Sequence, residues 1–248
     1  MYQSFYTGAL GAGTCMAKMG VMANNLANIN NDGFKPKTAA FTDLLQYNLN
    51  DSETAVTELQ AGNGVRMQRT YSSYATSAFT TTNSDIDYAI VNSNQFFMVQ
   101  DPGTGEITYT RSGHFHRAEM PDGFYLATDS GKLVLDQNRQ PVRVKDTLEE
   151  QDGAAQNPEE EEQEVSLYTF THPSRLLSSG DNEFTAPEDM PPMLVENPKL
   201  ITGAVERSGT DLAKEMVRVI ECQRAFSYAL RMVTTSDEIE STINSLRG

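Results

Sequence analysis

Apolar residues near the start of the chain recur at alternating spacings of four and three positions. The row consists of Phe5, Ala9, Ala12, Met16, Met19, Ala23 and Leu26. This is the a/d spacing of a helix that packs along one face against another helix. We expect this helix to end near residues 28–31, because Gly33 suits a left-handed cap and Pro36 prevents the helix from resuming.

The end of the chain repeats the pattern. Its row is Leu212, Met216, Val219, Phe226, Leu230 and Val233, with Gln223 filling one position. After residues 234–236 the phase shifts, and the row continues with Ile239, Ile243 and Leu246. We expect Ser208 or Thr210 to cap this helix, with Asp211 favourable near the positive end of the helix dipole.

Two such helices at opposite ends of one chain predict pairing with each other, with a partner, or both. The simpler alternative is that both are amphipathic helices packed on the chain's own core. The N-terminal row consists largely of Ala and Met, which bury little area, and four glycines each cost about 1 kcal/mol of helix propensity. We therefore expect the N-terminal helix to order when a neighbour supplies the other half of its contact.

Between the two ends the period changes from helical to strand-like. Two hairpins are predicted: residues 95–100 with 107–111, and residues 124–128 with 132–136. Further strands are expected within 69–82, 86–91 and 165–170. The predicted fold class is therefore α+β, mainly β: N- and C-terminal helices pairing as a coiled coil, and a central all-β domain.

This interpretation divides the chain into four parts. Residues 1–35 form the N-terminal helix and its cap, and residues 36–62 form an extended linker. Residues 63–207 form the β domain, which includes an acidic loop at 146–164, and residues 208–248 form the C-terminal helix. The loop holds nine acids and no base, which is typical of a solvated segment.

Charge follows the same division. The 248 residues carry a net charge of −15, yet the first 40 carry +2 and residues 210–248 carry −1, which leaves −16 on the middle. Such an acidic chain is a poor partner for nucleic acid, which binds clustered Lys and Arg. We expect no membrane-spanning helix and no secretory signal, because no long uncharged apolar run is present and Lys18 interrupts the apolar N-terminal stretch.

Candidate chemistry is sparse. His114 and His116 would lie on one face of a strand. The simpler interpretation is that both are exposed histidines without a special role, and the alternative is that they form a pair of metal ligands. Arg111 is expected to form a structural ion pair with Asp85 or Asp87. Cys15 and Cys222 are interpreted as apolar fillers, with an interhelical bridge as the alternative if the end segments pair. We therefore predict no enzyme activity, no cofactor and no metal.

Four groups of sequence blocks resemble bacterial flagellar axial proteins, the subunits of the rod and hook. Ala23-Asn-Asn-Leu-Ala-Asn-Ile-Asn-Asn-Asp-Gly-Phe-Lys35 resembles their N-terminal signature. Early β blocks at 62–65, 86–90 and 96–97, a hairpin at 109–115, and C-terminal blocks at 215–217, 223–226 and 235–237 follow in the family's order. The chain differs from the family at two places. Residues 92–95 lack the glycines that the family has there, and residues 208–211 differ from the family's usual sequence before the last helix.

The resemblance implies a structural rod subunit, more similar to the distal than to the proximal rod proteins. In such proteins the end helices pair inside a helical tube and the β domain faces outward. It implies assembly with further copies and with other rod or hook subunits. It also implies export through the flagellar type III apparatus without a cleaved signal peptide, and a location in the basal body outside the inner membrane.

The expected assembly interface draws on both helices and on the signature. Its residues are Phe5, Ala9, Ala12, Met16, Met19, Ala23, Asn25, Leu26, Asn28, Gly33, Phe34, Leu212, Met216, Val219, Gln223, Arg224, Phe226, Leu230, Val233, Ile239, Ile243 and Leu246. The alternative function is a secreted binding module, in which the heptad helices at the two ends oligomerise the β domain. An enzyme in the central domain is a third hypothesis, which a pocket joining His114, His116 and acidic side chains would favour.

Overall fold

The computed structural model describes residues 2–44, 47–48, 60–121, 123–144 and 165–247. Within these the chain forms two compact units, each of which is described by itself. The first contains the described residues of 1–28, 37–73 and 210–248, and the second contains those of 29–36 and 74–209. The expected acidic loop at 146–164 lies outside the described residues.

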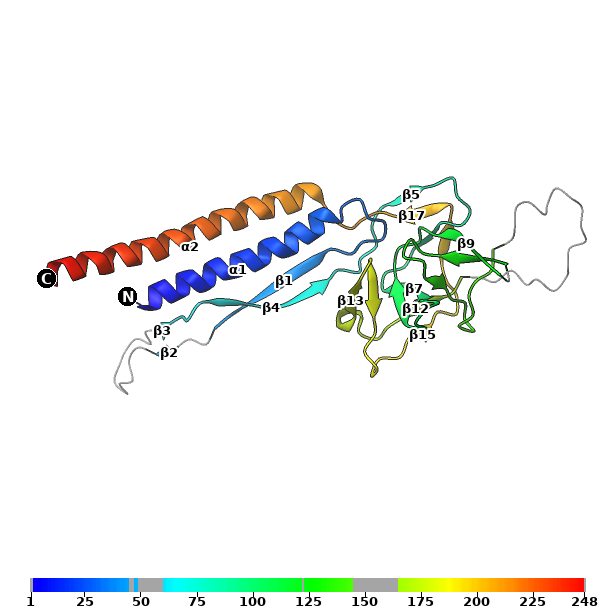
Figure 1. The fold of residues 1–248 in the computed structure, drawn as a ribbon, viewed down its shortest axis with the longest axis horizontal. Coiled ribbons are helices and arrows are strands. Elements are labelled where there is room, and N and C mark those ends of the chain that lie inside the picture. Colours follow the sequence, from blue (N-terminus) through cyan, green and yellow to red (C-terminus); the bar gives the residue numbers. More distant parts are fainter. Residues whose placement is uncertain (1, 45–46, 49–59, 122, 145–164, 248) are drawn as a thin grey trace, which may run out of the picture. The chain divides into compact units, whose positions relative to one another are not determined.

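The first unit is built on two long helices (Figure 1). Helix α1 covers Tyr2–Ala27 and α2 covers Leu212–Arg247. The two run antiparallel side by side, and α1 also packs against a hairpin-like pair of strands, β1 (Lys37–Asp43) and β4 (Val65–Ser72). A further short pair joins β2 (Tyr47–Asn48) to β3 (Gln60–Ala61).

Both helices begin and end close to where the sequence predicts. The cap of α2 differs from the expectation of Ser208 or Thr210. The Asp211 carboxylate accepts a hydrogen bond from the Lys214 amide at 3.2 Å, so Asp211 is the capping residue. Gly33 does adopt a left-handed φ of 67°, but it lies beyond the end of α1 and does not cap it.

The second unit contains a nine-stranded sheet whose main path runs β13–β14–β8–β7–β11–β10–β9, with β12 beside β7 and β15 beside β12. Its strands are β7 (Gln95–Gln100), β8 (Ile107–Thr110), β9 (His116–Met120), β10 (Gly123–Ala127), β11 (Leu133–Val134), β12 (Leu167–Thr169), β13 (Leu177–Gly180), β14 (Glu183–Thr185) and β15 (Met193–Leu194). A short 3₁₀ helix, η2, covers Pro173–Arg175. Two more antiparallel pairs join β6 (Tyr88–Ile90) to β16 (Leu200–Thr202) and β5 (Phe79–Thr81) to β17 (Ala204–Glu206).

Both hairpins predicted from the sequence are confirmed, since β7 pairs antiparallel with β8 and β10 with β11. Alternate residues of β7 enter two different parts of the core. Phe96 and Met98 join a cluster rich in aromatic side chains, whereas Phe97 and Val99 join a mainly aliphatic cluster. A strand buried on both faces explains why this segment is apolar at consecutive positions instead of alternating.

The fold class is confirmed as α+β, with helices at both ends and a central β region. The observed units differ from the predicted segments. Strand β4 and the described part of residues 37–62 belong with the helices, because β4 pairs with β1 and packs on α1. Residues 29–36 belong with the central strands instead of with the N-terminal helix.

Candidate assembly surface

The contact between α1 and α2 follows a regular row on each helix, which we call the inner row. The inner row of α1 is Gly8, Ala12, Cys15, Met19, Met22 and Leu26, all buried or half-buried. The inner row of α2 is Glu215, Val219, Cys222, Phe226, Ala229, Val233 and Ser236, also buried or half-buried. Both rows have the alternating four-three spacing that the sequence predicts for paired helices.

Direct contacts fix the register of the pair. The Ser4 and Ser236 hydroxyls lie 3.1 Å apart near one end, and the Cys222 thiol donates a hydrogen bond to the Cys15 carbonyl oxygen at 3.2 Å further along. Between them α1 approaches α2 closely at Gly8, where an added Cβ would lie 3.1 Å from the Val233 side chain. Small residues on α1 therefore allow the two backbones to come close.

The predicted rows share every second member with the inner rows. Ala12 is buried, and Met19, Leu26, Val219, Phe226 and Val233 are half-buried. The intervening predicted residues are exposed and form what we call the outer rows. On α1 these are Phe5, Ala9, Met16 and Ala23, and on α2 they are Leu212, Met216, Gln223 and Leu230, with Arg224 exposed beside them.

Helix α2 continues beyond the start of α1. Ser236 is already opposite Ser4, so the last turns of α2 have no described part of α1 alongside them. This overhang carries Ile239, Ile243 and Leu246, and Leu246 is 82% exposed. Along its full length α2 buries only Glu215 and Cys222. An apolar surface of this extent on a helix is typical of one that a partner covers.

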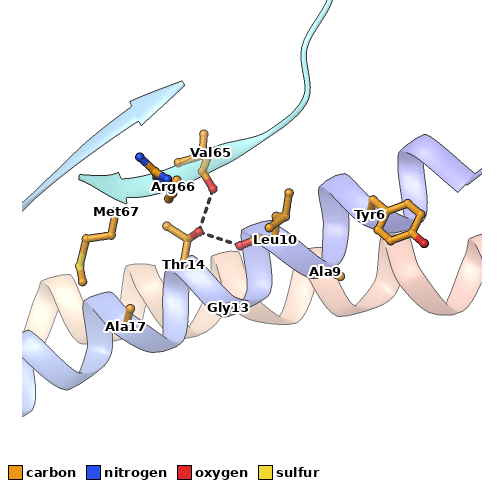
Figure 2. A pocket seen from close by; sticks show the side chains of 9 residues that line it. All are labelled: Tyr6, Ala9, Leu10, Gly13, Thr14, Ala17, Val65, Arg66 and Met67. Carbon is orange, nitrogen blue, oxygen red and sulfur yellow. Dashed lines mark hydrogen bonds between the residues drawn. The ribbon is translucent and has the colours of Figure 1, made fainter. Parts of the chain in front are cut away.

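A groove of about 420 Å³ lies between α1 and β4 (Figure 2). Ala9, Gly13 and Ala17 of α1 line it together with the larger side chains of Tyr6 and Leu10.

Strand β4 contributes Val65, Arg66 and Met67 to the groove. The Thr14 hydroxyl shares its hydrogen between the carbonyl oxygens of Leu10 and Val65, at 2.7 and 2.9 Å, and so ties α1 to the strand. The groove thus adds a largely apolar hollow to the surface formed by the outer rows.

The family signature divides between the two units. Its first half stays with the helices: Asn25 is buried, and its side-chain amide exchanges two hydrogen bonds of 2.8 Å with the backbone of Lys37. Asn28 lies just past α1, where its side-chain amide donates to the Asn24 carbonyl at 2.8 Å. Asn25 therefore ties the end of α1 to the start of β1, and Asn28 closes the last turn of the helix.

The second half of the signature is buried in the central unit. Gly33 and Phe34 are both buried, and an added Cβ on Gly33 would lie 2.6 Å from the Arg111 carbonyl oxygen. The Gly33 amide donates to the carbonyl oxygen of Glu206 at 2.6 Å, and the Gly209 amide donates to that of Phe34 at 2.9 Å. Glycine is therefore required at position 33, because the backbone of Arg111 lies too close to leave room for a side chain.

Lys35 ends the signature in a buried ionic cluster with Glu206 and Arg111, each about 1% exposed. Lys35 Nζ and Arg111 Nε each lie 2.7 Å from one oxygen of the Glu206 carboxylate. Burial and the neighbouring Arg111 cation lower the pKa of Lys35 from 10.5 to about 8, although Glu206 opposes the shift. Two cations share one carboxylate, so the cluster is not electrically balanced when Lys35 is protonated.

The expected ion pair of Arg111 with Asp85 or Asp87 is wrong. Arg111 pairs with Glu206, and its terminal N–H groups donate to the Thr76 hydroxyl at 3.2 Å and to backbone carbonyl oxygens, including that of Asn92 at 2.8 Å. Glu206 also accepts the Ser77 amide at 2.6 Å. One carboxylate thus joins three separate segments of the central unit. The role of Glu206 could not be predicted from the sequence, because no local pattern distinguishes this residue.

Each histidine of the candidate metal pair faces a different carboxylate. His114 lies 3.2 Å from Asp87 and His116 lies 3.8 Å from Asp129, and both imidazoles are about half exposed. Among the described residues, no group of three or more His, Cys, Asp and Glu side chains is arranged to hold a metal ion. The geometry therefore gives the hypothesis of an enzyme in the central domain no support.

A helix pair with exposed apolar rows, joined to a separately packed β unit, is the architecture of a structural subunit that other chains complete. Comparison with known proteins agrees with this class. Residues 201–246, which span β17 and nearly all of α2, match the family described as flagellar basal body rod FlgEFG protein C-terminal.

Relatives match over the whole length. The flagellar basal-body rod protein FlgG of Buchnera aphidicola subsp. Schizaphis graminum is 31% identical over 265 residues, covering 99% of this chain and 100% of the relative. FlgG of Bacillus subtilis is 26% identical and the hook-basal body complex protein FlhP of that organism 25%, each covering 100% of both chains. The chain belongs to the flagellar basal-body rod protein family, so the resemblance is confirmed.

Membership makes this chain a structural protein of the flagellar basal-body rod, which assembles with other rod or hook subunits. Within the described part of the chain, neither helix carries a stretch apolar enough to cross a lipid bilayer.

Proposed function

We propose that this chain polymerises through its end helices into a helical tube that forms part of the flagellar rod and transmits torque. In this proposal α1 and α2 form a coiled coil in the inner layer of the tube and the acidic central unit faces outward. The subunit leaves the cell through the flagellar type III apparatus without a cleaved signal peptide, and it occupies a position more similar to the distal than to the proximal rod.

The observation that carries the proposal is the apolar surface of the helix pair. The outer rows, the groove beside α1 and the overhang of α2 are different surfaces of one unit. A contact between two different surfaces repeats from copy to copy, and it produces an open helical assembly when the rotation between copies does not close a ring. The overhang of α2 in one copy and the surface of α1 in the next provide such a pair of unlike surfaces.

Substitution of Leu230 tests the proposal. Leu230 belongs to the outer row of α2 and is 43% exposed, so Leu230→Asp should leave the subunit folded. In a strain that lacks its own copy, we expect this variant to be made and exported but to form no rods by electron microscopy and to restore no motility. The matched control is Leu177→Asp in the central unit, where Leu177 is 66% exposed; it should assemble normally.

The alternative of a secreted β-domain module predicts a different outcome. A module that its heptad ends oligomerise would form a closed oligomer of fixed size in solution. Sedimentation of the purified chain distinguishes the two, because the rod subunit should form either monomers or polymers of varied length. Rods of normal length from Leu230→Asp would reject the helix surface as the site of assembly.

A further inference from the structure

The two cysteines of the chain meet across the helix pair. Cys15 lies on α1 and Cys222 on α2, and they are separated by 207 positions in the sequence. The Cys222 Sγ atom lies 3.2 Å from the carbonyl oxygen of Cys15. The two thiols also interact with one another, and this contact acts with burial to raise the pKa of Cys222.

The surrounding contacts hold the two residues in register. Ser4 meets Ser236 and Gly8 meets Val233 on one side of the cysteines. Both cysteines belong to the inner rows, where the helices are closest. A disulfide needs Cβ atoms roughly 3.5–4.5 Å apart, and such distances occur only where two backbones approach closely.

Exposure differs between the two thiols. Cys15 is half-buried, whereas Cys222 is 2% exposed. A small disulfide molecule therefore reaches Cys15 before Cys222, and the buried thiol is already in place to react with whatever forms on Cys15.

We propose that Cys15 and Cys222 are a disulfide-forming pair that covalently joins α1 to α2 when the chain meets a low-molecular-weight or protein disulfide. This goes beyond the proposed function, which needs no covalent link. The Cys15 thiol loses its proton to solvent, and its thiolate attacks one sulfur of the oxidant. The oxidant's S–S bond breaks, and the released thiolate takes up a proton.

The second step closes the bridge. The Cys222 thiol loses its proton, and its sulfur attacks the Cys15 sulfur and displaces the remaining half of the oxidant as a second thiol. Two electrons pass from the protein thiols to the oxidant, which is reduced to two thiols. The product links the two ends of the chain, and because the closed loop is long it favours the paired state of helices that are marginal by themselves.

The test equilibrates the full-length chain with mixtures of reduced and oxidised glutathione. The matched control is Cys222→Ala combined with Gln223→Cys, which moves the thiol by one residue to an exposed position on another face of α2. The loop length is almost unchanged, so only the helix geometry differs. Reaction is stopped by alkylation, and the cysteine peptides are identified by mass spectrometry.

We expect the native pair to form an intramolecular disulfide at an oxidised-glutathione concentration at least about tenfold below that needed by the control. After oxidation, the helical circular dichroism of the native chain should increase and that of the control should not. Equal oxidation of the two proteins, or a native chain that gives only glutathione adducts or cross-linked dimers, would overturn the proposal.

Discussion

Strand β7 buries its apolar side chains, whereas helix α2 exposes most of its own. Four consecutive residues of β7, Phe96, Phe97, Met98 and Val99, are at most 1% exposed. Helix α2 is 36 residues long and buries only two of them. Most buried apolar side chains lie in the central unit, whereas the helices carry most of the large apolar side chains that are exposed. One chain therefore combines a unit with a large buried core and a helix unit whose exposed apolar rows we propose further copies cover.

The ionic cluster belongs to the buried interior of the central unit, where a charge is tolerated only if it is paired and hydrogen-bonded. Glu206→Gln would leave Lys35 and Arg111 buried together without their carboxylate. We expect it to lower the free energy of unfolding of the central unit by about 3–5 kcal/mol. The chain lacks Trp, so unfolding in urea is followed by the near-ultraviolet circular dichroism of tyrosine.

The control for this change is Asp189→Asn, which breaks the pair of Asp189 with Arg175. Both side chains of that pair are more than half exposed, so a loss of no more than about 1 kcal/mol is expected. Equal effects of the two substitutions would show that the cluster does not hold the segments of the central unit together.

The helix pair can be disrupted without altering the outer rows. Gly8→Val would place a side chain where even an added Cβ would lie 3.1 Å from the Val233 side chain and 3.2 Å from the Ala229 carbonyl oxygen. We expect the pairing of α1 with α2 to weaken by about 1–3 kcal/mol through overpacking.

The readout for Gly8→Val is helical circular dichroism in the free chain and rod assembly in cells. The control is Gly13→Ala, because nothing lies within 4 Å of an added Cβ there, and it should increase helicity through propensity alone. If Gly8→Val pairs and assembles as the native chain does, the inner row is not the contact between the helices.

The period of both helices could be predicted from the sequence, but the phase of their contact could not. The predicted and observed rows share Ala12 and Met19 on α1, and they differ in whether the intervening position is Met16 or its neighbour Cys15. A search for large apolar residues favours Met16, yet close packing of helices favours small residues such as Gly8. At this position the smaller Cys15 therefore lies in the inner row, and the larger Met16 is exposed.

The smallest expected effect concerns the protonation of Lys35. Its pKa is about 8 in the folded chain and 10.5 in the unfolded chain. Between these values the unfolded chain binds more protons, so the contribution of Lys35 to stability increases with pH. From pH 8 to pH 9 we expect the native chain to gain about 1 kcal/mol of unfolding free energy relative to Lys35→Met.

Lys35→Met serves as the reference for the native chain, because every other titrating group is common to both proteins. Urea unfolding of the two at each pH gives the difference directly. A difference that stays constant or decreases over this range would mean that Lys35 is not buried beside Arg111 as the fold places it.

The strands of the central unit could be predicted because their signals are local. The segment 95–100 is apolar and bounded by a turn, and it forms β7 with the bounds expected. The ionic cluster could not be predicted in the same way. Glu206 is 171 positions from Lys35 and 95 from Arg111, so no spacing pattern connects them.

We expect the exposed apolar side chains of the helices, and not those of the central unit, to become covered in the rod. Methionine oxidation by hydrogen peroxide tests it directly, because the helix unit exposes Met16, Met216 and Met232 at 60%, 53% and 51% while the central unit exposes Met193 at 46%. Free subunits and purified basal bodies are treated alike, and sulfoxide is measured by mass spectrometry.

In free subunits all four methionines should oxidise at similar rates. In basal bodies we expect the three helix methionines to be protected while Met193 stays reactive. Helix methionines that oxidise as fast in the rod as in the free subunit would contradict the account.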